Sequence, residues 1–155
     1  INSKFCRDVE GSDKRHSFRL ILGSQSEKLY LFESAIDLLS YFTMYKMKHQ
    51  QMPELNAISL SGVYISGRKE AALPAALQHH LSEIPSLEQI TICFDSDIPG
   101  RKAAEHIAKT LQGKYKVAIR LPTKFKDYND MLISICEPGH NIATRSTHRK
   151  MQVTR

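Results

Sequence analysis

The sequence predicts an α/β protein with a mainly parallel sheet, and three observations support that prediction. Short apolar stretches typical of strands alternate along the chain with helical patterns of roughly 10 to 15 residues. The length of 155 residues matches the usual size of one domain. Contents of 41% hydrophobic and 25% charged residues are ordinary for a globular protein. Because such an alternation builds βαβ units, we expect helices on both faces of the sheet.

The first part of the chain is predicted to contain a β-hairpin, a strand and a helix. Two β-like stretches, residues 4–9 and 17–23, flank the turn-forming cluster EGSDK and predict the hairpin. Residues 28–33 (KLYLFE) have strand character and lead directly into a helix. That helix is indicated by apolar residues at helical spacing, namely Ala35, Leu38, Leu39, Phe42 and Tyr45.

The central part continues the alternation of strands and helices. Residues 56–66 (NAISLSGVYIS) contain a short strand that ends at the Ser-Gly pair, and a helix is expected to start near Pro74. The apolar run SLEQITICF predicts another strand. The helix that follows has Pro99 in its first turn and Gly113 at its end.

The last part is predicted to consist of a strand, a loop and a tail. Residues 115–121 (YKVAIRL) form the strand, and we interpret PTKFKDYNDML after it as a polar loop. From about residue 138 the chain turns polar and has no strand or helix periodicity. We therefore expect an N-terminal hairpin extension (1–24), an α/β domain (25–137) and a basic, flexible tail (138–155).

The composition narrows the class of protein. No apolar run approaches the roughly 18 residues needed to cross a bilayer, and the start does not resemble a secretion signal, so we expect a cytoplasmic protein with no membrane partner. Cys6, Cys93 and Cys136 lie far apart without a CxxC pair, which argues against a disulfide framework or zinc site. The net charge of +6 favours polyanionic partners. Because the chain begins with Ile1, we expect it to be a segment of something longer or to have been trimmed.

Three acidic clusters fall at or after the carboxyl ends of predicted strands. Glu33 closes KLYLFE, Asp95 and Asp97 follow QITICF, and Asp127 and Asp130 lie in the loop after YKVAIRL. In an open parallel sheet, ligands bind in the crevice beyond these strand ends. Carboxylates there suit Mg²⁺, which keeps several waters and is usually held by one or two carboxylates plus substrate phosphates. This arrangement predicts phosphoryl or nucleotidyl transfer.

Each acidic residue also has a structural interpretation. Ser34 and Asp37 fit a helix capping box, and Ser96 or Asp97 fits the N-cap of the helix that follows. The two aspartates of the last loop fit ordinary loop positions. Glu33 is harder to explain in this way, because a carboxylate at the end of an apolar strand must be solvated, paired or bound to a metal.

Two other kinds of site share the spacing of Asp95 and Asp97. A calcium-binding EF-hand loop that starts at Asp95 is excluded. Its fifth position would need an oxygen ligand and its twelfth a glutamate, but this chain has Pro99 and His106 there, and a strand rather than a helix precedes it. A phosphatase of the haloacid dehalogenase type would use Asp95 as nucleophile and Asp97 as general acid and base. That alternative leaves Glu33 without a role and places the first motif unusually late.

Basic residues near the acidic clusters are candidates for contacts with a phosphate backbone, although each also fits a plain surface charge. They are Arg68, Lys69, Arg101, Lys102, Lys124 and Lys126.

Three motifs in order carry a family resemblance. LYLFESAIDLLSY resembles the glutamate motif of Toprim domains, and ICFDSDIPGRKAAEHIAKTL resembles their Asp-x-Asp-x-x-Gly motif and its helix. KDYNDML is similar to the third acidic segment of Toprim domains in primases and primase-helicases. SLSGV and EGSDKRHSFRL further resemble Toprim-containing proteins of plasmids and conjugative transposons. The resemblance spans about residues 28–132.

The resemblance implies a Rossmann-like α/β fold with a four-stranded parallel core and an acidic centre that uses Mg²⁺, with Mn²⁺ as an alternative. It implies single-stranded DNA or RNA as a partner. By position it implies an acid or base near the reacting oxygen (Glu33), metal ligands (Asp95 and Asp97), supplementary ligands (Asp127 and Asp130) and a tight turn (Gly100).

The chain departs from the family pattern in one place. Primase relatives often have a proline and a second acid where this chain has Tyr128 and Asn129, which weakens the third acidic segment as a metal site. No tyrosine lies in a topoisomerase cleavage motif, and no zinc-binding module of a primase is evident. We therefore expect a catalytic or metal-binding fragment that works with other domains.

Three hypotheses remain open from the sequence. The first is a Toprim nucleotidyl-transfer domain of a primase-like protein that serves replication or transfer of a mobile element. The second is a Toprim nuclease of the overcoming-lysogenisation-defect type. The third is a Toprim module that binds nucleic acid without catalysis.

Overall fold

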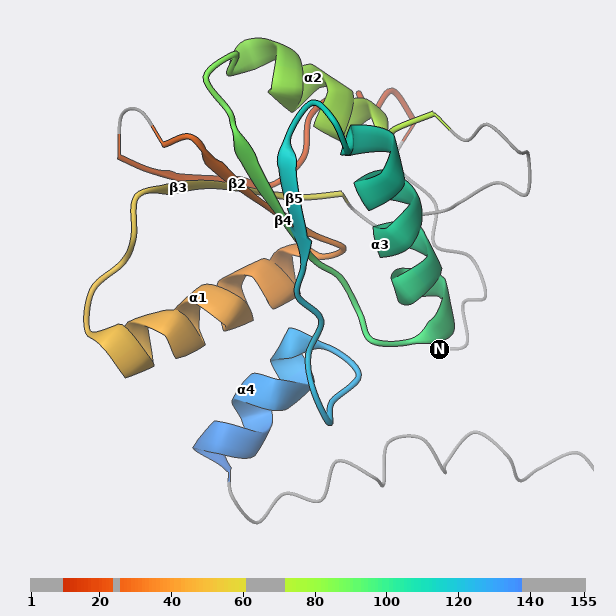
Figure 1. Ribbon diagram of the computed structural model, residues 1–155. Coiled ribbons are helices and arrows are strands. Elements are labelled where there is room, and N and C mark those ends of the chain that lie inside the picture. The colour runs from red at the N-terminus through yellow and green to blue at the C-terminus, as the bar shows by residue number, and fades with distance from the viewer. Residues whose placement is uncertain (1–9, 24–25, 61–71, 138–155) are drawn as a thin grey trace, which may run out of the picture.

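The computed structural model describes residues 10–23, 26–60 and 72–137, and within them five strands form one sheet (Figure 1). The strand order is β1-β3-β2-β4-β5. The four strands from β3 to β5 pair in parallel, and β1 pairs antiparallel with β3 at one edge. The predicted α/β fold with a four-stranded parallel core is confirmed. The strands are β1 (Arg19–Leu22), β2 (Lys28–Phe32), β3 (Leu55–Ser59), β4 (Gln89–Cys93) and β5 (Lys116–Ile119).

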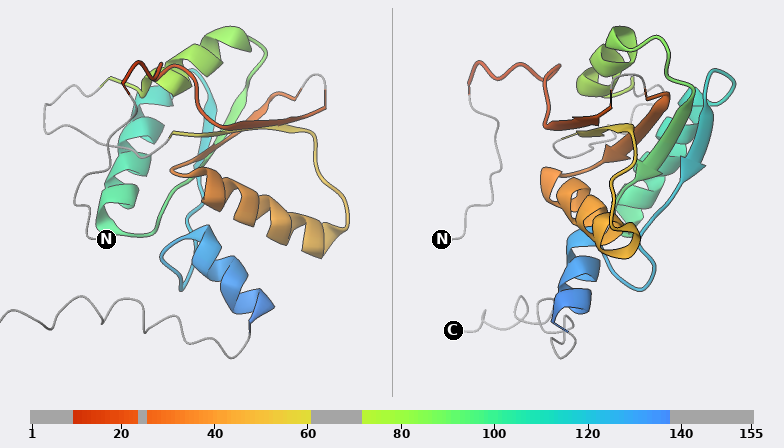
Figure 2. Two further views of the ribbon diagram at one scale, coloured as in Figure 1. Left: turned by 180° about the vertical axis from the view of Figure 1, so that it is seen from behind. Right: turned by 90° about the vertical axis from the view of Figure 1, so that its left-hand side faces the viewer.

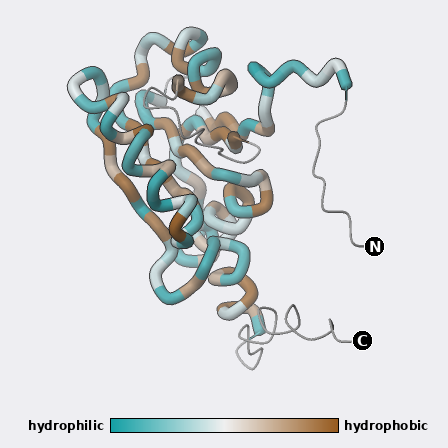
Figure 3. Tube along the Cα trace, turned by 90° about the vertical axis from the view of Figure 1, so that its right-hand side faces the viewer, coloured by the Kyte–Doolittle hydropathy of each residue, from teal (hydrophilic) through white to brown (hydrophobic). Residues whose placement is uncertain are grey.

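Helices cover both faces of the sheet, as predicted (Figure 2). Helices α2 (Ala75–Glu83) and α3 (Ile98–Leu111) pack on one face through an aliphatic cluster that includes Leu77 and Ile107. Helix α1 (Ala35–His49) packs on the other face through an aromatic cluster that includes Phe42. The central strands β2, β3 and β4 are deeply buried, whereas the edge strands β1 and β5 are not. Hydrophobic and hydrophilic residues alternate along the chain (Figure 3).

The helix starts follow their capping signals. The Ser34 hydroxyl accepts a hydrogen bond from the Asp37 amide at 3.1 Å and donates one to the Asp37 carboxylate, so Ser34 is the N-cap of α1. Asp97 is the N-cap of α3, with Pro99 in the first turn. Gly113, with φ of +93°, lies just beyond the end of α3 and takes the left-handed conformation that glycine tolerates.

The prediction that PTKFKDYNDML is entirely a loop was wrong. Its last part begins helix α4 (Tyr128–Cys136), with Asp127 as the N-cap. The Asp127 carboxylate accepts a hydrogen bond from the Asp130 amide at 2.8 Å. The helix was missed because its first turn is polar. It packs onto the aromatic cluster of α1 through Tyr128 and Met131, and two residues three positions apart are too few to reveal a helical period.

The structure describes only the second strand of the predicted N-terminal hairpin. Its second strand forms β1, which joins the main sheet beside β3. Its first strand (4–9) lies outside the described residues, as do residues 62–66, the basic pair Arg68 and Lys69, and the tail from 138. None of the described helices combines the length and hydropathy that crossing a membrane requires.

Candidate acidic site at the carboxyl edge of the sheet

The two central strands bring Glu33 and Asp95 together. Strands β2 and β4 are parallel neighbours with Phe32 opposite Cys93, so the residues that follow them leave the sheet at the same edge. The Glu33 Oε1 atom accepts a hydrogen bond of 3.1 Å from the Asp95 amide. Both residues are partly buried. Two carboxylates from segments 62 residues apart in the chain thus share one small region.

Helix α3 begins directly against this pair. The Asp97 Oδ1 atom accepts a hydrogen bond of 2.9 Å from the Gly100 amide, which fixes the first turn. Gly100 is buried so closely that an added Cβ atom would lie 2.5 Å from the Asp95 carbonyl oxygen and 2.7 Å from Glu33 Oε1. Only glycine allows this close approach. The helix therefore packs its amino end onto the acidic pair.

The segment after β5 completes the region. The Ser96 amide donates to the Lys126 carbonyl at 2.7 Å, and the Ser96 hydroxyl donates to the Phe125 carbonyl at 2.6 Å. These bonds hold the Lys126 ammonium 3.1 Å from Asp95 Oδ2 and 3.9 Å from Asp127 Oδ2. All three acidic segments of the sequence therefore meet, with a lysine between the second and the third.

Burial is the largest influence on the pKa values of the acidic pair. Burial, and next the charge of Asp95, raise the pKa of Glu33 from 4.5 to about 7. Burial also raises the pKa of Asp95, against the hydrogen bond from Lys126, which lowers it. The Lys126 side chain is 58% exposed, so its pairing is weak and easily exchanged for another cation.

Asp127 and Asp130 are both engaged in the start of α4. Asp127 caps the helix by accepting from the Asp130 amide. Asp37 lies nearby, because its Oδ1 atom accepts a hydrogen bond of 3.2 Å from the Asn129 amide, and its charge raises the pKa of Asp95. The sequence assigned Asp37 to the capping box of α1, and its second contact, to α4, has no signal in the sequence because the packing of the two helices creates it.

Tyr128 and Asn129, the two residues that depart from the family pattern, hold helix α4 in place. The Tyr128 hydroxyl donates a hydrogen bond of 2.6 Å to the Arg120 carbonyl, and its ring is 4% exposed. Asn129 contacts Asp37 through its amide and accepts from the Ser40 hydroxyl at 3.4 Å. These two residues therefore connect α4 to α1 and to the end of β5 through packing and hydrogen bonds.

The basic candidates differ in their surroundings. The Arg101 Nε atom donates to the Ser96 carbonyl at 2.6 Å, which ties this side chain to the loop before α3. Lys102 is exposed on α3. Lys124 is exposed too and has a φ of +69° in the turn before Lys126.

The donor chemistry of this site fits a hard divalent cation. All of its acidic groups offer oxygen, and the Lys126 ammonium already lies against Asp95, where a metal cation would bind. Across the described residues, no group of three or more His, Cys, Asp or Glu side chains is arranged to hold a metal ion. A divalent cation at this site would therefore need water to complete its coordination shell.

The fold and this site define an α/β protein whose carboxylates converge beyond the ends of adjacent parallel strands. The sequence model of the Toprim-like family matches residues 30–132, and the chain belongs to that family. A solved structure similar to it is the primase fragment of the bacteriophage T7 primase-helicase protein, at 24% identity and a TM-score of 0.49. That match covers 72% of this chain and 41% of the fragment, so the chain spans less than half of the fragment's length. The search of curated proteins found no match.

Proposed function

We propose that this chain is the metal-binding, catalytic part of a protein that transfers nucleotidyl or phosphoryl groups on nucleic acid, most like the Toprim domain of a primase from a mobile element. The observation that carries the proposal is the contact of Glu33 with Asp95 at the ends of two adjacent parallel strands. Membership of the Toprim-like family supports it. The net charge of +6 suits single-stranded DNA or RNA as substrate.

In this proposal the acidic residues divide the work. Asp95 and Asp97 hold Mg²⁺ or Mn²⁺, and Asp127 and Asp130 supplement them. A divalent cation held by these residues would neutralise charge that develops on the phosphate oxygens. Glu33, with a pKa of about 7, holds or accepts a proton near the reacting oxygen at neutral pH.

The basic residues bind the substrate backbone. Arg101, Lys102 and Lys124 are exposed and contact phosphates. A substrate phosphate would compete with Asp95 for the Lys126 ammonium, because the Lys126 side chain is 58% exposed and its ion pair is weak.

A second candidate function is binding of nucleic acid without catalysis. One observation favours it: the Lys126 ammonium already neutralises Asp95. In that case the basic residues bind the strand and the acidic pair shapes the loop before α3. Metal titration and activity assays separate the two functions.

Metal binding is tested by titrating Mn²⁺ into the protein and measuring the free ion by electron paramagnetic resonance, with and without single-stranded DNA. We expect weak binding that strengthens when DNA is present. The Asp95→Ala, Asp97→Ala double variant should lose it. Asp97→Asn should also weaken binding, and because an asparagine keeps the cap on Gly100 while removing the charge, that loss would not come from a disrupted helix start. Unchanged binding in the double variant would show that the proposed site is wrong.

Catalysis is tested by assaying primer synthesis and DNA cleavage in the intact parent protein beside its Glu33→Gln variant. Glutamine keeps an oxygen that can accept the Asp95 amide hydrogen bond, so the fold is preserved. Primer synthesis lost in the variant supports the primase-like function. Cleavage without synthesis supports the overcoming-lysogenisation-defect type of nuclease. Activity equal in both proteins, or absent from the parent, favours the binding module.

The setting of this activity also belongs to the proposal. We expect residues 25–137 to form the Toprim domain, with residues 1–24 as an N-terminal extension and 138–155 as a basic, flexible tail. Other domains of a longer chain in the cytoplasm supply the rest of the reaction. The gene context tests this, since an adjacent zinc-binding module favours priming and an adjacent ATPase domain favours the nuclease.

A further inference from the structure

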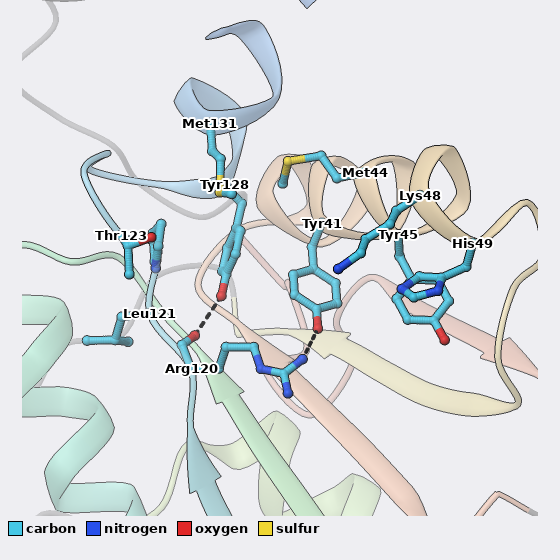
Figure 4. Close-up of a pocket in the computed structure, with 11 residues that line it drawn as sticks. Tyr41, Met44, Tyr45, Lys48, His49, Arg120, Leu121, Thr123, Tyr128 and Met131 are labelled. Atoms are coloured by element: carbon cyan, nitrogen blue, oxygen red, sulfur yellow. Dashed lines mark hydrogen bonds between the residues drawn. The ribbon is translucent and has the colours of Figure 1, made fainter. Parts of the chain in front are cut away.

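A cavity of about 370 Å³ lies between helices α1 and α4 and the segment that follows β5 (Figure 4). We call it the α1–α4 pocket. It is separate from the carboxylates of the acidic site, since no acidic residue is among those that line it in the described chain. Its principal lining residues are Tyr41, Tyr45, Lys48, Arg120, Tyr128 and Met131.

Hydrogen bonds fix the inner end of the pocket. The Arg120 Nη1 atom donates to the Tyr41 hydroxyl at 2.6 Å, and the Tyr128 hydroxyl donates to the Arg120 carbonyl at 2.6 Å. The rings of Tyr41 and Tyr128 meet edge to face, with centroids 5.0 Å apart. Both tyrosines are buried. The guanidinium of the exposed Arg120 is therefore tied by one hydrogen bond to a buried aromatic pair.

The outer wall comes from the last turns of α1. Tyr45 and His49 lie ring against ring, with centroids 4.4 Å apart and planes inclined by 34°. Figure 4 shows Tyr45, Lys48 and His49 projecting from this helix on one side of the pocket. The thioethers of Met44 and Met131 form adaptable apolar walls. A flat aromatic ligand can stack or pack against these surfaces.

The charge of the pocket selects the kind of ligand. Its charged lining residues are the cations Lys48 and Arg120, and His49 adds a third basic group. An aromatic surface next to a guanidinium and an ammonium suits a planar ring that carries an anionic group. A fatty acyl chain would leave the hydroxyl and cationic groups unused. A nucleotide has both required parts, a flat base and a phosphate.

We propose that the α1–α4 pocket binds one nucleotide unit, with the base between the aromatic and methionine side chains and the phosphate at Lys48 and Arg120. The unit comes from a free nucleotide or from a single strand, since both present the same chemistry. The segment from Arg120 to Tyr128 lines the pocket at both of its ends, and between them Lys126 pairs with Asp95 of the acidic site. Binding in the pocket does not depend on catalysis at that site.

The direct test follows the methyl resonances of ¹³C-labelled methionine in the full chain, in buffer with EDTA so that no metal contributes. The probes are ATP and a short oligothymidylate. We expect ring-current shifts at Met44 and Met131, which line the pocket, and none at Met47, which is exposed on the same helix. Shifts with either probe support the proposal and identify the source of the nucleotide. Shifts at neither methionine overturn it.

Variants test the roles of charge and base. Lys48→Ala should weaken binding about fivefold or more, whereas Lys46→Ala, which removes the same charge from an exposed position of α1 outside the pocket, should change it less than about twofold. Tyr45→Leu should weaken binding by about tenfold through lost stacking. An abasic oligonucleotide of the same length should bind as weakly as the Tyr45 variant binds the normal strand. Equal losses in both lysine variants, or full binding of the abasic strand, would contradict the proposal.

Discussion

Gly100 shows at the scale of one residue how closely the acidic site is packed. A methyl group at this position would overlap the Asp95 carbonyl oxygen and Glu33 Oε1. We expect Gly100→Ala to lower the free energy of unfolding by about 1–3 kcal/mol, because backbone atoms must move to make room. Urea denaturation followed by circular dichroism measures this. Glu105→Ala on the exposed face of α3 is the control, and it should stay within about 0.5 kcal/mol of the parent. An equal effect of both changes would contradict the close approach.

Glu33 makes stability depend on pH in a defined direction. Its pKa is raised in the folded state from 4.5 to about 7, so the folded protein favours the protonated form. The stability from this group is full below about pH 4.5 and is lost as the pH rises through about 7. Because the side chain is partly exposed, we expect the loss to be about 1 kcal/mol after solvent screening.

The measurement compares the parent with Glu33→Gln in EDTA between pH 4.5 and 8. The difference in unfolding free energy between the two proteins should change by about 1 kcal/mol in favour of the variant as the pH rises. Added Mg²⁺ should reduce this change if the cation binds the site. A pH-independent difference would show that Glu33 titrates in the folded protein as it does in the unfolded chain.

The ion pair of Lys126 with Asp95 could not be predicted from the pattern of residues. The sequence grouped it with five other basic residues as a phosphate contact, because spacing gives no partner for a lysine in a loop. Its pairing with Asp95 depends on the bonds that tie residues 125–126 to Ser96, which only the folded chain brings into contact. The acidic residues were easier to identify, since their positions follow from the ends of parallel strands.

At the scale of elements, the start of α4 depends on one cap. Asp127→Ala removes the acceptor for the Asp130 amide, and we expect the protein to lose about 1 kcal/mol of unfolding free energy. Asp127→Asn should keep nearly all of the stability, because asparagine caps as well as aspartate. Chemical denaturation of both variants measures the difference. A similar loss in the asparagine variant would mean that the charge of Asp127, rather than its cap, stabilises the helix.

The elements that the sequence predicted correctly have strong local signals. Helix α3 has a proline in its first turn, apolar residues at helical spacing and a glycine beyond its end. Helix α4 has a cap three residues before an aspartate but a polar first turn, so its first five residues, 128–132, were predicted to belong to a loop. Its stability comes from packing on α1, which is a tertiary contact and leaves little trace in the local pattern.

At the scale of the whole molecule, the sequence predicted the class of sheet but not the neighbours of every strand. Alternating strands and helices required parallel pairing, which places Glu33 and Asp95 at one edge. The pairing of β1 with β3 was not predicted, because the hairpin interpretation gave β1 a partner nearby in the chain. The residues of β1 alternate between exposed and partly buried, and this alternation does not indicate which edge of the sheet the strand joins.

Strand β1 is expected to contribute to the stability of the whole domain. It hydrogen-bonds along β3, its partly buried Leu20 and Leu22 pack against the aromatic cluster, and Arg19 pairs with Glu83 of α2 at 3.0 Å. Without it, β3 becomes an open edge with unpaired backbone groups, which favours association with other chains.

We expect a chain that starts at residue 25 to be about 2–4 kcal/mol less stable than one that starts at residue 16, through lost apolar burial and strand hydrogen bonds. The longer chain is the matched control, because it keeps Phe18, whose carbonyl accepts from the Ser59 amide at 2.9 Å, and all of β1. Urea denaturation gives the free energies, and sedimentation velocity detects self-association of the shorter chain. Equal stability and a monomeric state in both would show that β1 is an accessory strand and that the parallel sheet is stable without it.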